Sequence, residues 1–187
     1  FPEAVRTWAG TTLPIDPSIG KLVKFLNVPV IVSVSRGMNL FNPRWSKKVR
    51  RTPVEIEYRL LLDGTRIDQL EPEAIHQAIV DALQHDEVDY QRKHRNKIHD
   101  NHRAEHISHT LFVCPSCHAI DPFISEGNDF HCSGCNYDLH INELGFFQPK
   151  GQGQIHFDNI RDWYDWQIGQ MAAYVRRHLT SQNENPL

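Results

Sequence analysis

The sequence has no long apolar run, few cysteines and nearly balanced charges. No stretch of 18 apolar residues occurs, so we expect no segment of these 187 residues to span a bilayer. Twenty Lys and Arg against 23 Asp and Glu give a net charge of −3, which excludes a global basic field that would attract nucleic acid. With 40% hydrophobic residues, the chain can bury a sizeable core, and we expect one domain with an appendage.

The four cysteines occur as two pairs, and their spacing predicts a metal site before it predicts disulfides. Fourteen residues separate the two C-x2-C pairs, which are Cys114 with Cys117 and Cys132 with Cys135. Each turn can aim two thiolates at one ion, and two turns complete a tetrahedral shell of four sulfurs. Such a shell leaves no position for water, so we expect structural zinc. His118 and His131 lie beside the cysteines and rank below them as ligands.

The region around the cysteines lacks basic side chains. No Lys or Arg occurs from Ala104 to Pro149, although the same stretch contains several acidic residues. Phosphate neutralisation by Lys and Arg is the main source of nucleic-acid affinity. The composition therefore argues against a nucleic-acid-binding zinc ribbon, which is the rival interpretation of the module.

Periodicity and turn residues predict the secondary structure. Ile19–Leu26 has helical spacing with Ser18 as a cap, and Pro72 begins a second helix that extends to Leu83. The β-branched run Val28–Val34 predicts a strand covered on both faces, as in an α/β sheet. The remaining expected elements are a strand at Val54–Leu62 and an amphipathic helix from a cap at Asp158 to about Leu179.

Two histidine patterns match the spacing of catalytic motifs, but we assign a catalytic role to neither. His76 and Asp81 are separated by four residues, but a regular helix turns their side chains roughly 140° apart. His102 to His106 fits the H-x-x-E-H pattern of some zinc peptidases, in a segment so rich in His that chance accounts for it. We interpret 96–110 as a solvated, His-rich linker.

A basic, loop-like segment lies between Arg36 and Arg51. Five of the eight residues from Arg44 to Arg51 are Lys or Arg, and Trp45 lies among them. A solvated face is the ordinary explanation. The alternative is attraction to phosphates at a membrane surface or on an acyl donor, with Trp45 as an anchor at headgroup level.

The opening residues Phe1-Pro2-Glu3-Ala4-Val5-Arg6-Thr7 place a carboxylate and a guanidinium close together. The planar donors of Arg6 match a pair of phosphate oxygens. On physical grounds alone, an exposed ion pair near a chain end is the ordinary explanation of Glu3 and Arg6.

This block resembles the phosphate-binding motif of the glycerolipid acyltransferases, usually Phe-Pro-Glu-Gly-Thr-Arg-Ser. Phe1, Pro2, Glu3 and Arg6 match, whereas a small Gly is replaced at Ala4 and two further positions differ. The order of later features also resembles one bacterial branch of the family. These features are the Val-Pro-Val-Ile strand, Pro43-Arg44-Trp45, the four-cysteine ribbon, Asn142–Phe147 and an Asp-Trp-rich helix.

The resemblance implies an α/β fold: the C-terminal part of an acyltransferase domain with a mixed sheet, a zinc ribbon and a C-terminal helix. It implies an O-acyltransferase that moves a fatty acyl group from acyl-CoA or acyl carrier protein to 1-acylglycerol 3-phosphate. Glu3 and Arg6 would hold the acceptor phosphate. The catalytic His and Asp would lie upstream of Phe1, so we expect these 187 residues alone to be inactive.

The expected organisation is 1–95 for the acyltransferase part, 96–110 for the linker, 111–147 for the ribbon, and 148–187 for a loop and amphipathic helix. The expected partners are a lysophosphatidate-type lipid, an acyl thioester and the cytoplasmic face of a membrane, with peripheral contact or an upstream anchor. No nucleic-acid partner is expected. Two alternatives stay open: a zinc-ribbon module that binds other macromolecules, and an acyltransferase-like protein that has lost activity.

Overall fold

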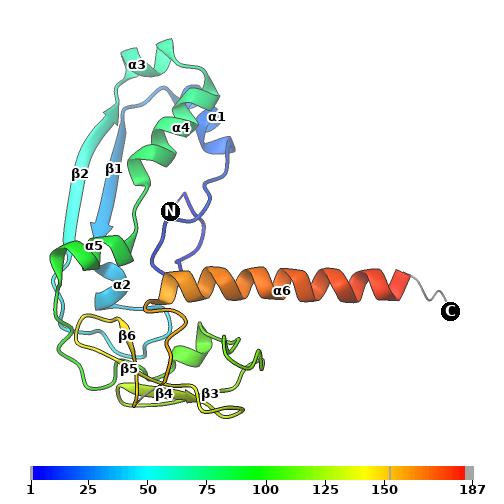
Figure 1. Cartoon of the computed structure of the whole chain (residues 1–187). Coiled ribbons are helices and arrows are strands. Elements are labelled where there is room, and N and C mark those ends of the chain that lie inside the picture. The colour runs from blue at the N-terminus through cyan, green and yellow to red at the C-terminus, as the bar shows by residue number, and fades with distance from the viewer. Residues whose placement is uncertain (1, 152, 184–187) are drawn as a thin grey trace. The chain divides into compact units, whose positions relative to one another are not determined.

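A computed structural model describes residues 2–151 and 153–183, so Phe1 of the opening block lies outside the described residues. The chain forms two compact units, which we describe separately (Figure 1). Unit 1 comprises Phe1–Arg44 and Val49–Asn96, and unit 2 comprises Trp45–Lys48 and Lys97–Leu187. Within the described residues, no helix has the length and hydrophobicity needed to cross a membrane.

Unit 1 combines helices with a two-stranded antiparallel sheet. The predicted elements at 19–26, 54–62 and 72–83 are confirmed to within a residue or two. In chain order the elements are α1 (Ser18–Leu26), β1 (Val30–Arg36), α2 (Met38–Phe41), β2 (Glu55–Leu62), α3 (Gly64–Gln69), α4 (Pro72–Leu83) and α5 (Glu87–His94). Ser18 does not cap α1 with its side chain; instead, Oδ1 of Asp16 accepts a hydrogen bond from the Ser18 N–H at 2.8 Å.

The sheet of unit 1 is covered on one face only. Strand β1 pairs antiparallel with β2, from Val30 opposite Leu62 to Arg36 opposite Glu55. Val32 and Val34 are buried on the face toward α4, which runs alongside β1 (Figure 1). On the other face, the exposed apolar side chains are Ile31, Ile56, Tyr58 and Leu60. The prediction that this strand is covered on both faces is therefore wrong, since no described element of unit 1 packs on the second face.

The core of unit 1 lies where α1, α3 and α4 meet the end of the sheet. Its buried members are Ile15, Leu62, Ile67, Ile75 and Ile79. The Nζ of Lys24 donates to the carbonyl oxygens of Ile67 and Leu70 at 3.0 and 2.8 Å, which satisfies acceptors at the end of α3. These contacts join α1, α3 and α4 without any cysteine.

Unit 2 contains a four-stranded antiparallel sheet and one long helix. The strands follow chain order, β3 (Phe123–Glu126), β4 (Asp129–Cys132), β5 (Asp138–Ile141) and β6 (Phe147–Pro149), after a short 3-10 helix η1 (Ile107–His109). The described sheets of both units pair antiparallel only, whereas a mixed sheet was expected.

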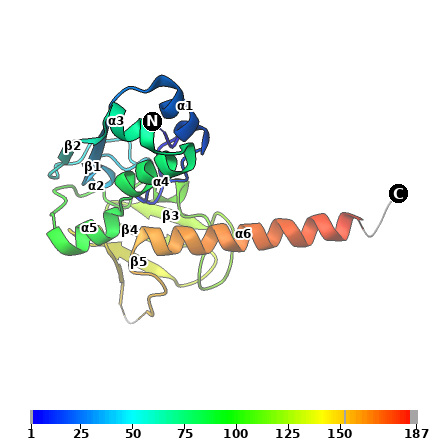
Figure 2. The same cartoon turned by 90° about the horizontal axis from the view of Figure 1, so that it is seen from above.

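Helix α6 (Ile160–Asn183) packs through its first turns and extends beyond the strands of its unit in both views (Figure 2). Its cap is Asn159 and not Asp158, because Oδ1 of Asn159 accepts from the Asp162 N–H at 3.0 Å. Trp163 is fully buried against five aromatic rings, which belong to Phe123, Phe130, Tyr137, Phe147 and Phe157. Further along the helix, Ile168, Tyr174, Val175 and Leu179 are exposed. Core packing thus explains only the first part of the amphipathic pattern.

The segment expected to be a solvated linker packs within unit 2. Ile98, Ala104 and Ile107 are almost completely buried, and the Ala104 N–H donates to Gly127 O at 2.9 Å. Because only three apolar residues are spread among several histidines, periodicity does not reveal this burial. Trp45 is only 7% exposed, so the alternative interpretation of Trp45 as a headgroup-level anchor is wrong.

Candidate functional site

The block that contains Glu3 and Arg6 forms a tight turn in unit 1. Ala4 has φ +60°, and the Val5 N–H donates to Glu3 O at 2.7 Å across a three-residue turn. Oε2 of Glu3 accepts from the Leu13 N–H at 3.1 Å, which fixes the carboxylate against the following loop. A positive φ favours glycine, so Ala4 keeps the backbone conformation suited to the Gly of the resembling motif.

Arg6 lies on the wall of a cavity and retains donors for a ligand. Its Nη2 donates to Asn42 O at 2.6 Å, and its own carbonyl accepts from Nη1 of Arg44 at 2.6 Å. Arg44 in turn lies over the Trp8 ring at 4.0 Å. These contacts fix the backbone and one edge of the Arg6 guanidinium, while the side chain as a whole is exposed.

The cavity has a volume of about 330 Å³ and lies within unit 1. Its walls come from the opening loop, the end of β1 with the turn into α2, and the segment that leads into α5. The polar lining residues are Glu3, Arg6, Thr7, Thr11, Thr12, Ser33, Ser35, Asn39, Asn42, His85 and Glu87. The structure thus brings both predicted phosphate-binding residues to one cavity, together with hydroxyl and amide groups that can donate to an anion.

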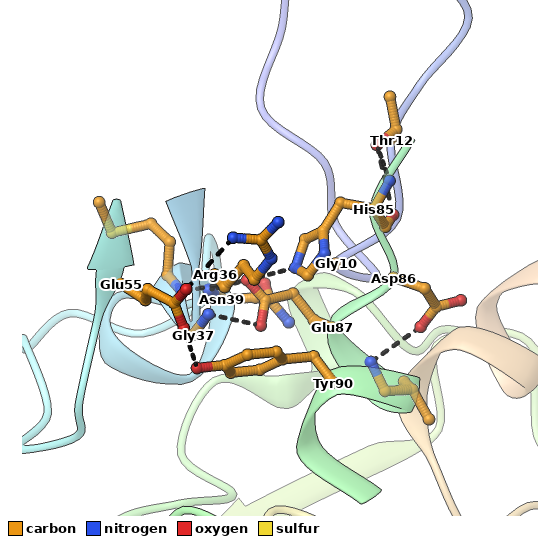
Figure 3. Close-up of polar contacts among 12 residues, drawn as sticks. Gly10, Thr12, Arg36, Gly37, Asn39, Glu55, His85, Asp86, Glu87 and Tyr90 are labelled. Carbon is orange, nitrogen blue, oxygen red and sulfur yellow. Dashed lines mark hydrogen bonds and ion pairs between the residues drawn. The ribbon is translucent and has the colours of Figure 1, made fainter. Parts of the chain in front are cut away.

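Two lining residues, His85 and Glu87, were not predicted from the sequence (Figure 3). Glu87 is 5% exposed, and its carboxylate accepts from the backbone N–H groups of Gly37 and Met38 at 2.9 and 3.0 Å. Nε2 of His85 is 3.4 Å from Oε1 of Glu87. The sequence offered one indication: Asp86 is a helix cap, so Glu87 begins α5, and a first-turn Glu can turn back toward neighbouring backbone.

Backbone pairing holds the His85 segment against the opening loop. The His85 N–H donates to Oγ1 of Thr12 at 2.8 Å, and the Thr12 N–H donates to His85 O at 3.0 Å. The Glu87 N–H donates to Gly10 O at 3.0 Å. Gly10 has φ +87°, and an added Cβ would lie 2.9 Å from the Glu87 side chain, so glycine is required for this approach.

The four cysteines of unit 2 form a cluster that can hold a metal ion. All four sulfurs lie within 4.8 Å of one another, with Cys114 to Cys135 at 3.8 Å and Cys117 to Cys132 at 3.6 Å. A tetrahedral ion with bonds of about 2.3 Å to sulfur separates its ligands by about 3.8 Å, so these positions fit such a shell. The cluster contains neither His118 nor His131.

Local backbone hydrogen bonds shape the two cysteine turns. The Cys114 N–H donates to Ala119 O at 3.0 Å and the Cys132 N–H donates to Tyr137 O at 2.9 Å, which closes one turn on each side. The Gly134 N–H donates to Sγ of Cys132 at 3.3 Å. Gln167 of α6 supports the first turn, because its Oε1 accepts from the Phe112 N–H at 2.9 Å.

Burial disfavours the charged form of two thiols. It raises the pKa of both Cys114 and Cys132. Burial acts in the same direction at Cys135, but a hydrogen bond from the Tyr137 backbone and the neighbouring thiols lower the pKa of Cys135 to about 7. Buried thiolates need a cation nearby, so the cluster is suited to a metal rather than to four free thiols.

The other histidine patterns do not form sites in the described residues. Nε2 of His76 lies 2.9 Å from Ile15 O, whereas Asp81 accepts from Gln77 on the exposed face of α4, so the two side chains do not meet. His102 and His106 do not share a helical face, because no helix covers this stretch and His106 has φ +65°.

Unit 2 also contains a hollow, which is lined by Ile98–Arg103 and Glu143.

Comparison of the chain with profiles of protein families, with curated proteins and with solved structures finds no match. The candidate sites therefore depend on their own geometry and on the resemblance of the motifs.

Proposed function

We propose that unit 1 carries the acceptor-phosphate site of a glycerolipid acyltransferase. The reaction moves a fatty acyl group from acyl-CoA or acyl carrier protein to the free hydroxyl of 1-acylglycerol 3-phosphate. The observation that carries the proposal is that Glu3 and Arg6 line one cavity, together with Asn39 and the end of β1. The left-handed backbone at Ala4, where the motif usually has Gly, supports it.

Arg6 would bind the phosphate through guanidinium donors not used by Asn42. Glu3 would act indirectly, because its hydrogen bond to the Leu13 N–H holds the loop that carries Arg6. Binding energy from this non-reacting phosphate would align the acceptor hydroxyl with the thioester carbonyl. The part played by these residues is thus positioning, while proton removal from the hydroxyl requires a general base.

The cysteine cluster would hold zinc in a structural role. Four thiolates are the donor set of closed zinc sites, which keep no position for water or substrate. Cys114, Cys117, Cys132 and Cys135 would be the ligands. When bound, the ion offsets part of the negative charge of the thiolates and links the two turns that flank the β3–β4 hairpin.

The exposed apolar face of the β1–β2 sheet is consistent with contact between this face and a lipid surface. Ile31, Tyr58 and Leu60 are 67%, 71% and 61% exposed on this face. Contiguous apolar surface is unusual unless something covers it. The proposed location is the cytoplasmic face of a membrane, where acceptor and product are both embedded.

The test measures acyl transfer by a polypeptide that contains these residues together with a catalytic His-x4-Asp pair, using acceptors with and without the phosphate. We expect Arg6→Ala to raise the KM for 1-acylglycerol 3-phosphate by the equivalent of about 2–4 kcal/mol, because a charge-assisted contact is lost. Transfer to a monoacylglycerol should not change.

Lys21→Ala, on the exposed surface of α1 in the same unit, is the matched control and should behave as wild type. Equal losses on both acceptors in Arg6→Ala would contradict a phosphate contact. The 187 residues alone should show no transfer, since the only His-x4-Asp pair of the sequence, His76 and Asp81, does not face one another.

A further inference from the structure

His85 is a titratable group in the cavity wall that the proposed reaction does not yet use. It lines the same cavity as Arg6, and its side chain is only 16% exposed. Two backbone hydrogen bonds to Thr12 fix its main chain, as Figure 3 shows. The ring is therefore held at the cavity and does not move freely in solvent.

The carboxylate of Glu87 lies next to one nitrogen of the His85 ring. Nε2 of His85 is buried, lies 3.4 Å from Oε1 of Glu87, and has no hydrogen bond in the described residues. Glu87 is itself fixed by the N–H groups of Gly37 and Met38, in which the carboxylate acts only as an acceptor. The Glu87 carboxylate is thus a fixed acceptor that lies beside Nε2 of His85.

The cavity needs a second cation if it is to bind a phosphate monoester. Such a group carries a charge of about −1.5 to −2 at neutral pH. Among the described residues that line the cavity, Arg6 is the only Lys or Arg, whereas Glu3 and Glu87 both carry carboxylates. His85 is the only other lining residue that can become positive.

We propose that His85, as an imidazolium held by Glu87, binds the phosphate monoester of the acceptor together with Arg6. The inference rests on the proposed function, and it assigns a binding residue outside the opening block. The titratable groups around His85 are Glu87 and Tyr90 of its own segment and Glu3 and Arg6 of the opening loop. Arg36 is not one of the residues that line the cavity, and its guanidinium is paired with the carboxylate of Glu57 at 2.8 Å.

The experiment titrates the metal-loaded chain with glycerol 3-phosphate at low salt and compares variants by calorimetry. We expect His85→Gln to weaken binding at least tenfold, because a hydrogen bond to a charged partner is lost. His94→Gln removes an exposed imidazole that stacks on Tyr90 in the same helix, and it should bind within twofold of wild type. Glycerol without phosphate should not bind.

A second measurement on the unmodified protein does not depend on how the variants fold. At pH 7.5, saturating glycerol 3-phosphate should move the ring ¹⁵N signals of His85 toward imidazolium values, and the signals of His94 should stay in place. If His85→Gln binds normally while Arg6→Gln binds weakly, or if the ring signals do not move, the role of His85 is refuted and the phosphate site stands. If binding is absent or indifferent to both variants, the phosphate site itself is refuted.

Discussion

At Ala4 the backbone adopts a conformation that glycine adopts without strain. The φ of +60° brings the Cβ of an L residue close to its own carbonyl, at a cost of about 1–2 kcal/mol. Glycine removes this cost but loses about 0.4–1 kcal/mol through greater freedom of the unfolded chain. We therefore predict that Ala4→Gly stabilises unit 1 by up to about 1 kcal/mol, measured by urea dependence of amide hydrogen exchange.

Ala74→Gly is the matched control, since Ala74 is an exposed residue inside helix α4 of the same unit. The same chemical change should destabilise there by roughly 0.5–1 kcal/mol, because helical φ gives glycine no advantage. If Ala4→Gly destabilised as much as Ala74→Gly, the left-handed turn of the opening block would be wrong.

Single residues differ in how much the sequence revealed about them. Glu3 and Arg6 were found because they lie in a short motif, and the structure places both at one cavity. His85 and Glu87 could not be identified as its neighbours, because their contacts reach Thr12 and Gly37, which are 73 and 50 residues away. Such pairings depend on the path of the chain and not on local spacing.

The indole ring of Trp163 is one of the groups through which helix α6 stabilises unit 2. Trp163 is fully buried, and its Nε1 donates to Val113 O at 2.9 Å, just before the first cysteine. Trp163→Phe removes this donor and part of the ring volume, so the carbonyl loses its partner inside the core. We predict a loss of about 2–4 kcal/mol in the stability of unit 2, measured by urea unfolding with near-ultraviolet circular dichroism.

Trp166→Phe gives the comparison one turn along the same helix. Trp166 is only half-buried, and its ring contacts are with Phe157 and His118. Its replacement should cost less than about 1.5 kcal/mol. Comparable losses in the two variants would show that the indole of Trp163 has no special part in the core.

At the level of elements, strong local patterns predicted helices and strands correctly, but they did not predict which faces of those elements are buried. The helices at 18–26 and 72–83 have clear periodicity, and β2 lies within a residue of its predicted bounds. The β-branched run of β1 predicted a strand, but which faces are covered depends on neighbouring elements, and Ile31 is exposed. For the same reason the apolar positions of α6 predicted burial that Ile168 and Tyr174 do not have.

At the scale of the whole molecule, the two units differ in what stabilises them: unit 1 has an apolar core, and unit 2 has the cysteine cluster. The core of unit 1 contains no cysteine, whereas in unit 2 the two cysteine turns lie where β3 begins and β4 ends. Without a metal ion, four thiols lie close together, two of them buried. We predict that a strong chelator unfolds β3 to β6 and leaves unit 1 folded, as measured by amide exchange in both units.

Zinc added back at one equivalent should restore protection in unit 2. Cys117→Ser should reproduce the effect of the chelator, and Ser116→Ala, beside it in the same turn, should not. Loss of protection in both units together, or in neither, would contradict a metal that stabilises unit 2 alone.

The sequence predicted the organisation of the chain only in part. The C-x2-C spacing located the cysteine cluster because two turns that meet at one ion leave a regular pattern. The segment 96–110 was interpreted as a linker because Ile98, Ala104 and Ile107 lie among polar residues in the sequence. The acyltransferase fold stays a prediction, because the antiparallel pairs described here are common to many folds.

The most direct measurement of the central claim is a crystal structure of the chain with glycerol 3-phosphate. The account predicts that the phosphate occupies the cavity of unit 1, with its oxygens about 2.7–2.9 Å from the guanidinium nitrogens of Arg6. The hollow of unit 2 lined by Ile98–Arg103 and Glu143 is the natural comparison. A phosphate in that hollow, or one ordered away from Arg6, would contradict the account.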